Sequence, residues 1–98
     1  MLWRHGDVLV ATVEQIPEGA EQQKTTVLAL GEVTGHSHRV EEAQKARVWK
    51  RGAQIFLEVT SETRIVHEEH KPIVLPVGVY RVWQQREYTP ERIVRVRD

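Results

Sequence analysis

Short runs of alternating apolar and polar residues follow one another along this chain, separated by glycine and proline. Branched and aromatic residues dominate the runs, and this composition is typical of β-strands. In the clearest run, residues 54–60, the side chains of Ile55, Leu57 and Val59 share one face of an extended chain. The pattern therefore predicts an all-β protein of six to eight short strands.

The expected strands and turns divide the whole chain. Turns are indicated where proline or glycine interrupts a run, at residues 17–19, 51–52, 76–78 and 89–91. Residues 41–46 contain good helix formers ahead of a strand-like run, so a loop or short turn is expected there. The predicted strands lie in 7–13, 25–33, 39–50, 54–60, 63–66, 73–75, 79–88 and 92–97.

Length and composition predict one domain over residues 1–98. Halves of a 98-residue chain would be too small to bury separate cores. Because closing or stacking sheets hides exposed strand edges, the expected fold is a single small β-barrel or a two-sheet sandwich. An edge left free would allow pairing with a second copy, so a homodimer is a hypothesis.

Charge and cysteine content narrow the function classes. The 14 basic and 14 acidic residues cancel, so no overall field attracts nucleic acid. The chain has no cysteine, which leaves nitrogen and oxygen ligands for any metal site and agrees with a cytoplasmic location. No apolar run approaches the roughly 18 residues needed to span a bilayer, and residues 1–7 lack the core of a secretion signal.

Four of the five histidines fall in two blocks, His-Ser-His at residues 36–38 and His-Glu-Glu-His at residues 67–70. Imidazole binds borderline metal ions and moves protons near neutral pH. The first pair shares a face if the chain is extended, whereas the second pair meets only in a turn, which Pro72 favours. If the blocks converge, the metal ligands would be His36, His38, His67 and His70.

A convergent site would hold a divalent transition metal, with zinc expected first and nickel, copper or iron as alternatives. Three protein ligands with an open position would suit catalysis, and four would suit a structural ion; the spacing leaves both open. A catalytic site would use Glu69 or Glu42 as base and Arg86 to orient a small anionic ligand. Tyr88 shares a strand face with Arg86 and could exchange protons with the same ligand.

Two alternatives need no metal. In the first, two histidines act as acid and base on a phosphodiester, as in a ribonuclease, while Arg86 or Arg39 steadies the phosphate. In the second, the protein is a non-catalytic binding or assembly module, and its tryptophans form part of a partner surface. Those tryptophans are Trp3, Trp49 and Trp83.

The order of motifs resembles that of the cupins, small β-barrels whose first motif contains His-x-His followed by Glu. The matching positions are Gly31, His36, His38, Glu42 and Pro76-Val77-Gly78. The resemblance implies a jelly roll with metal ligands at His36, His38 and Glu42. Arg81 stands where the second cupin motif has histidine, so the full ligand set is absent.

The chain also resembles a group of bacterial and phage proteins that share two histidine blocks. The first block reads Gly-Glu-Val-Thr-Gly-His-x-His and matches residues 31–38; the second is the His-Glu-Glu-His block at 67–70. Residues 85–90 match as well. This resemblance implies a common fold and no particular activity.

Overall fold

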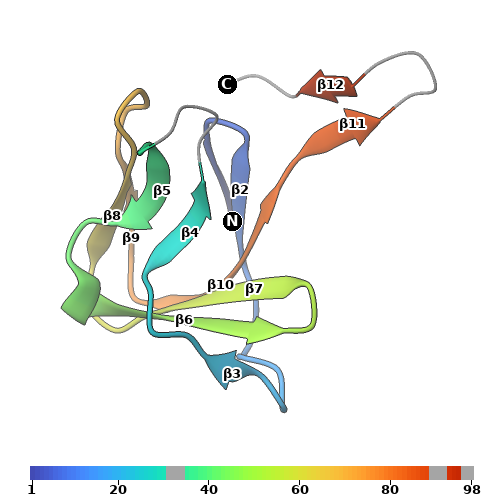
Figure 1. The fold of residues 1–98 in the computed structure, drawn as a ribbon. Helices are drawn as coiled ribbons and strands as arrows, with labels where there is room; N and C mark the ends of the chain where they lie inside the picture. The colour runs from blue at the N-terminus through green and yellow to red at the C-terminus, as the bar shows by residue number, and fades with distance from the viewer. Residues whose placement is uncertain (31–34, 89–92, 96–98) are drawn as a thin grey trace.

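Ten strands form two antiparallel sheets that pack on one another as a sandwich (Figure 1). The computed structural model describes residues 1–30, 35–88 and 93–95, and for 86–88 and 93–95 it describes the strands without their side chains. Within these residues no pairing joins an edge of one sheet to an edge of the other. The predicted all-β class is confirmed, and of the two predicted closures the sandwich forms while the barrel does not.

The larger sheet is built around β10, whose neighbours on both sides are antiparallel. Val82 of this strand lies opposite Val10 on one side and Ile55 on the other. Tyr80 and Val82 are buried and Arg81 between them is exposed, as the alternation of the strand requires. In spatial order the six strands are β1 (Leu2–His5), β2 (Val8–Thr12), β10 (Gly78–Gln84), β7 (Gln54–Val59), β6 (Ala46–Arg51) and β3 (Glu21–Gln22).

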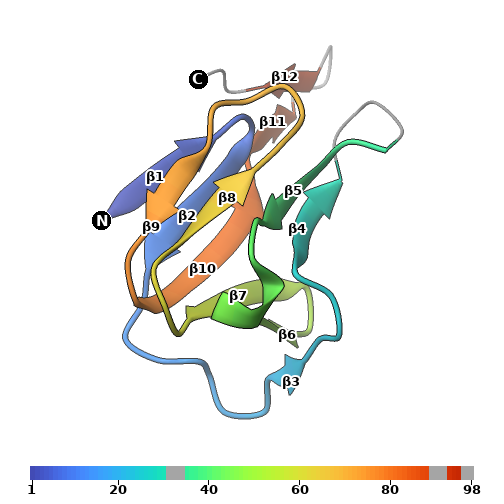
Figure 2. The ribbon, with the colours of Figure 1, turned by 90° about the vertical axis from the view of Figure 1, so that its left-hand side faces the viewer.

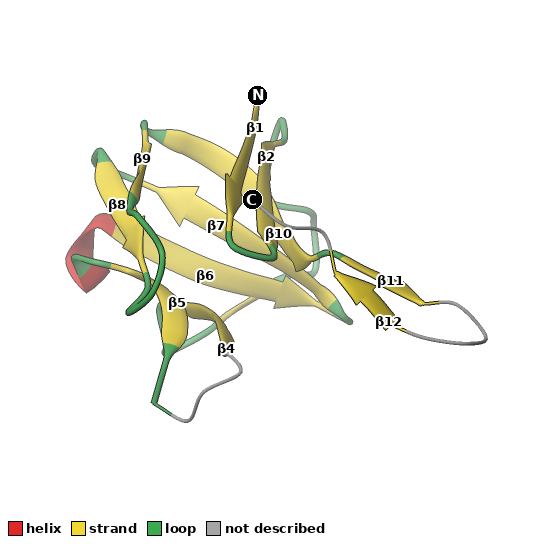
Figure 3. Cartoon of the chain, turned by 90° about the horizontal axis from the view of Figure 1, so that it is seen from above, coloured by secondary structure: helices red, strands yellow, loops and turns green. Residues whose placement is uncertain are grey.

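The smaller sheet covers one face of the larger, as the view from above shows (Figure 3). The short helical turn η1 (Ala43–Lys45) carries the chain from this sheet into β6. A separate antiparallel pair, β11 (Arg86–Tyr88) and β12 (Ile93–Arg95), follows β10. In spatial order the four strands are β4 (Val27–Leu30), β5 (Ser37–Val40), β8 (Thr63–Val66) and β9 (Ile73–Leu75).

The core lies between the two sheets and takes branched side chains from both. Leu57 of the larger sheet and Ile65 and Leu75 of the smaller sheet are fully buried. Burying a side chain of this size stabilises the fold by about 1.5–3 kcal/mol. The hydroxyl of Tyr80 donates a hydrogen bond to the carbonyl of Pro76, so the largest buried side chain keeps its polar atom satisfied.

The strand predictions hold for most of the chain, but three strands were not predicted as separate elements. The predicted turn and strand in 39–50 are η1 and β6, but β1, β3 and β5 raise the strand count above the six to eight expected. The run 79–88 is interrupted at Gln85, whose amide donates to the Asp7 carbonyl. Residues 31–33, 92 and 96–97 of two predicted strands lie outside the described residues, as does the predicted turn at 89–91.

The one helical element of the described residues is the three-residue turn η1. None of the described helices is long and apolar enough to cross a membrane.

Candidate metal centre

All five histidines meet at one end of the sandwich. The turn between β1 and β2, the start of β5 and the loop between β8 and β9 lie together there (Figures 1 and 2). Neighbouring rings approach to 4.4 Å between centroids for His38 and His67, and to 4.7 Å for His67 and His70. The two blocks therefore converge, which is the condition on which the metal site inferred from the sequence depends. We name this group the histidine cluster; its members are His5, His36, His38, His67 and His70.

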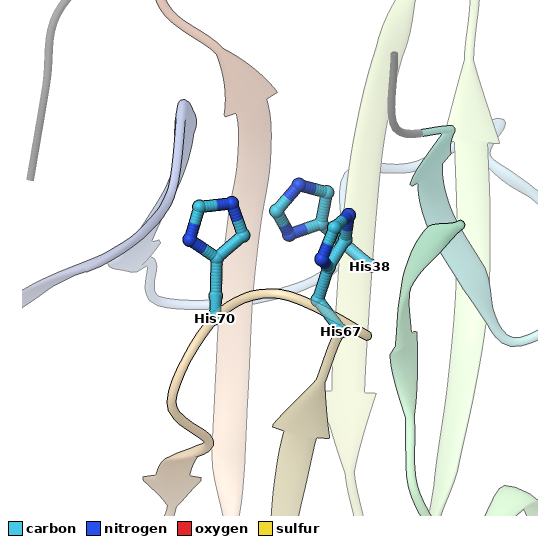
Figure 4. A group of neighbouring side chains, drawn as sticks. All are labelled: His38, His67 and His70. Carbon is cyan, nitrogen blue, oxygen red and sulfur yellow. The ribbon is translucent and has the colours of Figure 1, made fainter. Parts of the chain in front are cut away.

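Three members of the cluster are arranged to share one ion. One ligand atom each from His38, His67 and His70 lies within 4.8 Å of the others, and Figure 4 shows the three rings gathered above the loop. Nitrogens on one tetrahedral zinc lie about 3.3–3.4 Å apart, because each Zn–N bond is about 2.0–2.1 Å. Ligation thus requires the rings to close in by about 1.5 Å at most, which side-chain rotation in a loop can supply.

The loop between β8 and β9 presents its two histidines to the centre because Glu68 fastens it to β5. The Glu68 carboxylate accepts a hydrogen bond from the Ser37 amide at 3.0 Å and pairs with Arg39 at 2.9 Å. Backbone hydrogen bonds from Ser37 and from Glu68 itself, followed by Arg39, lower the pKa of Glu68 to about 2. An ionised carboxylate therefore anchors the loop over the whole physiological range.

Glu69 holds the fourth predicted ligand, His36. Its Oε1 lies 2.7 Å from His36 Nδ1, and because a carboxylate only accepts, the imidazole donates from Nδ1. A neutral His36 then keeps its lone pair on Nε2, available to an ion or a proton. Ligand atoms of His36, His67 and Glu68 also lie within 4.8 Å of one another, so His36 belongs to a second group beside the first.

His38 is kept neutral by its surroundings. Burial is the largest cause, and the neighbouring histidines add to it; together they lower the pKa of His38 to about 4, against a smaller opposing effect of Asp7. Burial, followed by the charge of His70, also lowers the pKa of His67. The neutral ring is the form that binds metal, so both side chains are in the ligating state at neutral pH.

His67 already uses one of its nitrogens within the loop. Its Nδ1 accepts a hydrogen bond from the backbone amide of Glu69 at 3.0 Å. An ion bound through that nitrogen would replace this hydrogen bond with a metal–nitrogen bond. The loop would then be held from the ion as well as from Glu68.

His5 joins the cluster although the sequence pattern did not single it out. It is buried at the end of β1, and its Nδ1 lies 2.9 Å from His38 Nδ1. The next residue, Gly6, has φ +65°, and a Cβ there would lie 2.6 Å from His70 Nε2. The one signal in the sequence is that His5 directly precedes the turn-forming Gly6-Asp7.

Asp7 lies behind His38 and is itself held in place. Its Oδ1 is 3.6 Å from His38 Nε2, while its Oδ2 accepts a hydrogen bond from Gln84 Nε2 at 3.2 Å. Its carbonyl accepts from the Gln85 amide at 2.8 Å. A carboxylate in this position favours hydrogen on His38 Nε2, which leaves Nδ1 as the ligating atom.

Comparison with known proteins assigns the chain to a family. Residues 4–85 match the family described as domain of unknown function DUF8820. The chain belongs to this family. The matched range covers the smaller sheet, the larger sheet apart from the first two residues of β1, and every member of the histidine cluster. Comparisons with curated proteins and with solved structures found no match.

Membership of the DUF8820 family takes the place of the expected cupin relationship, because no cupin family matches. The open sandwich agrees, since the sheets do not close into the expected barrel. The side chain of Arg81, at the position of the missing cupin histidine, lies over the ring of Trp83. Gly31 lies outside the described residues.

The remaining predicted site residues of this DUF8820 chain are Glu42, Arg39, Arg86 and Tyr88. Glu42 pairs with Lys45 at 2.9 Å beside η1. Arg39, the proposed phosphate contact, has its charge matched by Glu68 and also donates to the Ser37 carbonyl. Arg86 and Tyr88 lie in β11, and their side chains lie outside the described part of the structure, so their roles stay predictions.

Proposed function

We propose that this protein binds one divalent transition metal ion through His38, His67 and His70. The observation that carries the proposal is the convergence of three imidazoles from two separate elements, with ligand atoms within 4.8 Å of one another. Zinc is the first candidate because it accepts nitrogen ligands in tetrahedral sites; nickel, copper and iron also suit imidazole.

The charge balance of the centre supports a bound cation. The imidazoles of His5, His67 and His70 would repel that of His38 if protonated, and burial together with this repulsion lowers the pKa of His38 to about 4. When the rings are neutral, the same close spacing allows them to bind one metal ion together. Asp7, which contacts His38, is placed as a carboxylate behind a metal-binding histidine usually is.

Metal-independent phosphodiester chemistry is less well supported by the described residues. It needs a cation to steady the phosphate, and the guanidinium of Arg39 is engaged by Glu68. A second carboxylate, Glu69, lies against His36 at the same rim and would oppose an anion. The geometry therefore favours a cation over a phosphate at this end of the sandwich.

Metal analysis by mass spectrometry tests the proposal. Untagged protein is reconstituted with zinc, nickel, copper or ferrous iron in turn, dialysed, and compared with a His67→Ala/His70→Ala variant. The matched control is Lys71→Ala, which changes an exposed residue directly after His70. We expect one ion per chain in the wild type and the control and none in the double variant. Failure of all four metals to bind, or stoichiometric metal in the double variant, would overturn the proposal.

A further inference from the structure

We infer that His5 is the fourth ligand of this ion, and that the ion thereby joins the two sheets as a structural staple. The inference rests on the proposed metal site and adds to it a ligand that no sequence motif indicated. It replaces an open, catalytic type of coordination with a closed one.

The spacing of His5 and His38 carries the inference. Their Nδ1 atoms lie 2.9 Å apart. Two nitrogens on one ion lie about 2.9 Å apart at a right angle and about 3.3–3.4 Å apart in a tetrahedron, given metal–nitrogen bonds of about 2.0–2.1 Å. This pair is therefore close to ligand spacing. No ligand atom of His5 belongs to the groups whose members lie within 4.8 Å of one another, so the rings of His67 and His70 must move toward His5 for all four to share an ion. The His5 ring also lies 5.7 Å from that of His70 and 6.4 Å from that of His67, between centroids.

The imidazole hydrogens of His5 and His38 can rearrange so that both Nδ1 atoms bind the ion. Without an ion, one Nδ1 must donate its hydrogen to the other, so the two rings hold different tautomers. With an ion, both Nδ1 atoms ligate and both rings carry hydrogen on Nε2, so the donor ring moves its hydrogen and no proton is lost from the pair. In His38 this hydrogen faces the Asp7 carboxylate, 3.6 Å away, which stabilises the ligating tautomer.

The position of His5 gives the fourth bond a mechanical consequence. His38 lies on β5, and His67 and His70 lie between β8 and β9, so these three ligands belong to the smaller sheet. His5 ends β1 at the edge of the larger sheet. An ion held by all four residues would bridge the two layers at one end of the sandwich. The elements that carry these residues lie together at that end (Figures 1 and 2).

A small domain gains from such a bridge. A 98-residue sandwich has a limited core, and metal coordination adds its binding free energy to the folded state alone. Four protein ligands are the usual set of a structural zinc site, whereas catalytic sites keep one position open. The more exposed His36, paired with Glu69, then lies outside the coordination shell.

X-ray absorption spectroscopy of the zinc-loaded wild-type protein counts the imidazoles directly. Four nitrogen ligands with imidazole scattering are expected. A companion comparison uses His5→Gln, with His36→Gln as the matched control, since both replace a cluster histidine by a similar volume. We expect His5→Gln to weaken zinc binding at least about 100-fold and to lose most of the zinc-induced rise in Tm, and His36→Gln to change affinity less than about tenfold.

The outcomes separate this inference from the proposed function. Three imidazoles and an oxygen ligand in the wild type would overturn the role of His5 and leave the metal site standing. The role of His5 would also be overturned if folded His5→Gln binds zinc within about tenfold of the wild type. A change of that size is no larger than the loss of a hydrogen bond to a metal ligand. Absence of zinc binding in the wild type would overturn both. If His5→Gln fails to fold, the wild-type spectrum alone decides.

Discussion

A Cβ at Gly6 would lie 2.6 Å from His70 Nε2, closer than Cβ atoms approach nitrogen in proteins. The His70 ring can therefore lie against the turn between β1 and β2 in this position because residue 6 has no side chain. Gly6 also has φ +65°, a conformation that other residues rarely adopt. The same residue therefore permits both the tight turn after His5 and the position of His70.

Gly6→Ala should damage the metal site as well as the fold. The left-handed backbone alone costs about 1–2 kcal/mol for a residue with a Cβ. The matched control is Gly52→Ala, because Gly52 has φ +59° and a Cβ added there would meet no atom within 4 Å. We expect Gly6→Ala to be more destabilised in urea than the control and to bind zinc more weakly. Equal stability and equal affinity in the two variants would contradict this role for Gly6.

The sequence offered convergence of the two histidine blocks as a hypothesis, and it did not indicate that His5 joins them. Alternation in 54–60 predicted β7, and the three-residue spacing of His67 and His70 before Pro72 predicted a turn, because both signals are local. His5 stands 31 residues before His36 and reaches the cluster only through pairing of β1 with β2 and stacking of the sheets. Such contacts leave no periodic signal.

The pattern of apolar and polar residues also could not decide between a sandwich and a barrel. Both folds need the same buried alternation, seen in β10 and β8. They differ in whether edge strands such as β1 and β9 pair, which depends on strand length and sheet twist rather than on which residues are apolar. The roles of Glu68 and Glu69 in fastening the loop likewise became visible only with the structure.

Removing the charge of Glu68 should loosen the loop that carries His67 and His70. Glu68→Gln gives up the ion pair with Arg39 and weakens the hydrogen bond from the Ser37 amide. We expect zinc affinity to fall about tenfold, the range for losing an outer contact of a metal ligand. Competition with a chromophoric chelator measures it, with Glu62→Gln, an exposed carboxylate before β8, as the control. Unchanged affinity in Glu68→Gln would show that the loop needs no anchor.

The stability of the metal-free protein should fall as pH decreases through the acid range. The unfolded chain protonates His38 near its ordinary pKa of 6.5, whereas the folded protein does so only near its lowered pKa of about 4. The contribution of His38 to the free energy of unfolding is therefore fully present above pH 6.5. It is lost as the pH falls from 6.5 to about 4, by up to about 3 kcal/mol. The lowered pKa of His67 acts in the same direction.

Urea unfolding in the presence of a chelator, repeated across this pH range, measures the effect. His38→Gln removes the titrating ring, so its stability should depend less on pH than that of the wild type. Identical pH dependence in the wild type and His38→Gln would mean that His38 titrates normally in the folded protein.

The core should respond to truncation independently of the site. Leu57 is fully buried in β7, and Leu57→Ala should cost about 2–5 kcal/mol of stability through lost contacts and a cavity. The exposed Val77→Ala should change stability by no more than about 0.5 kcal/mol. Chemical denaturation of both variants makes the comparison, and a loss below about 1 kcal/mol for Leu57→Ala would be inconsistent with the packing described.

The most direct test of the metal site is zinc titration of ¹⁵N-labelled, untagged protein, followed through the imidazole nitrogens by NMR. We expect one nitrogen each of His38, His67 and His70 to shift together and to stop changing at one equivalent of zinc. If no imidazole nitrogen of these three residues responds to zinc, the central claim is wrong.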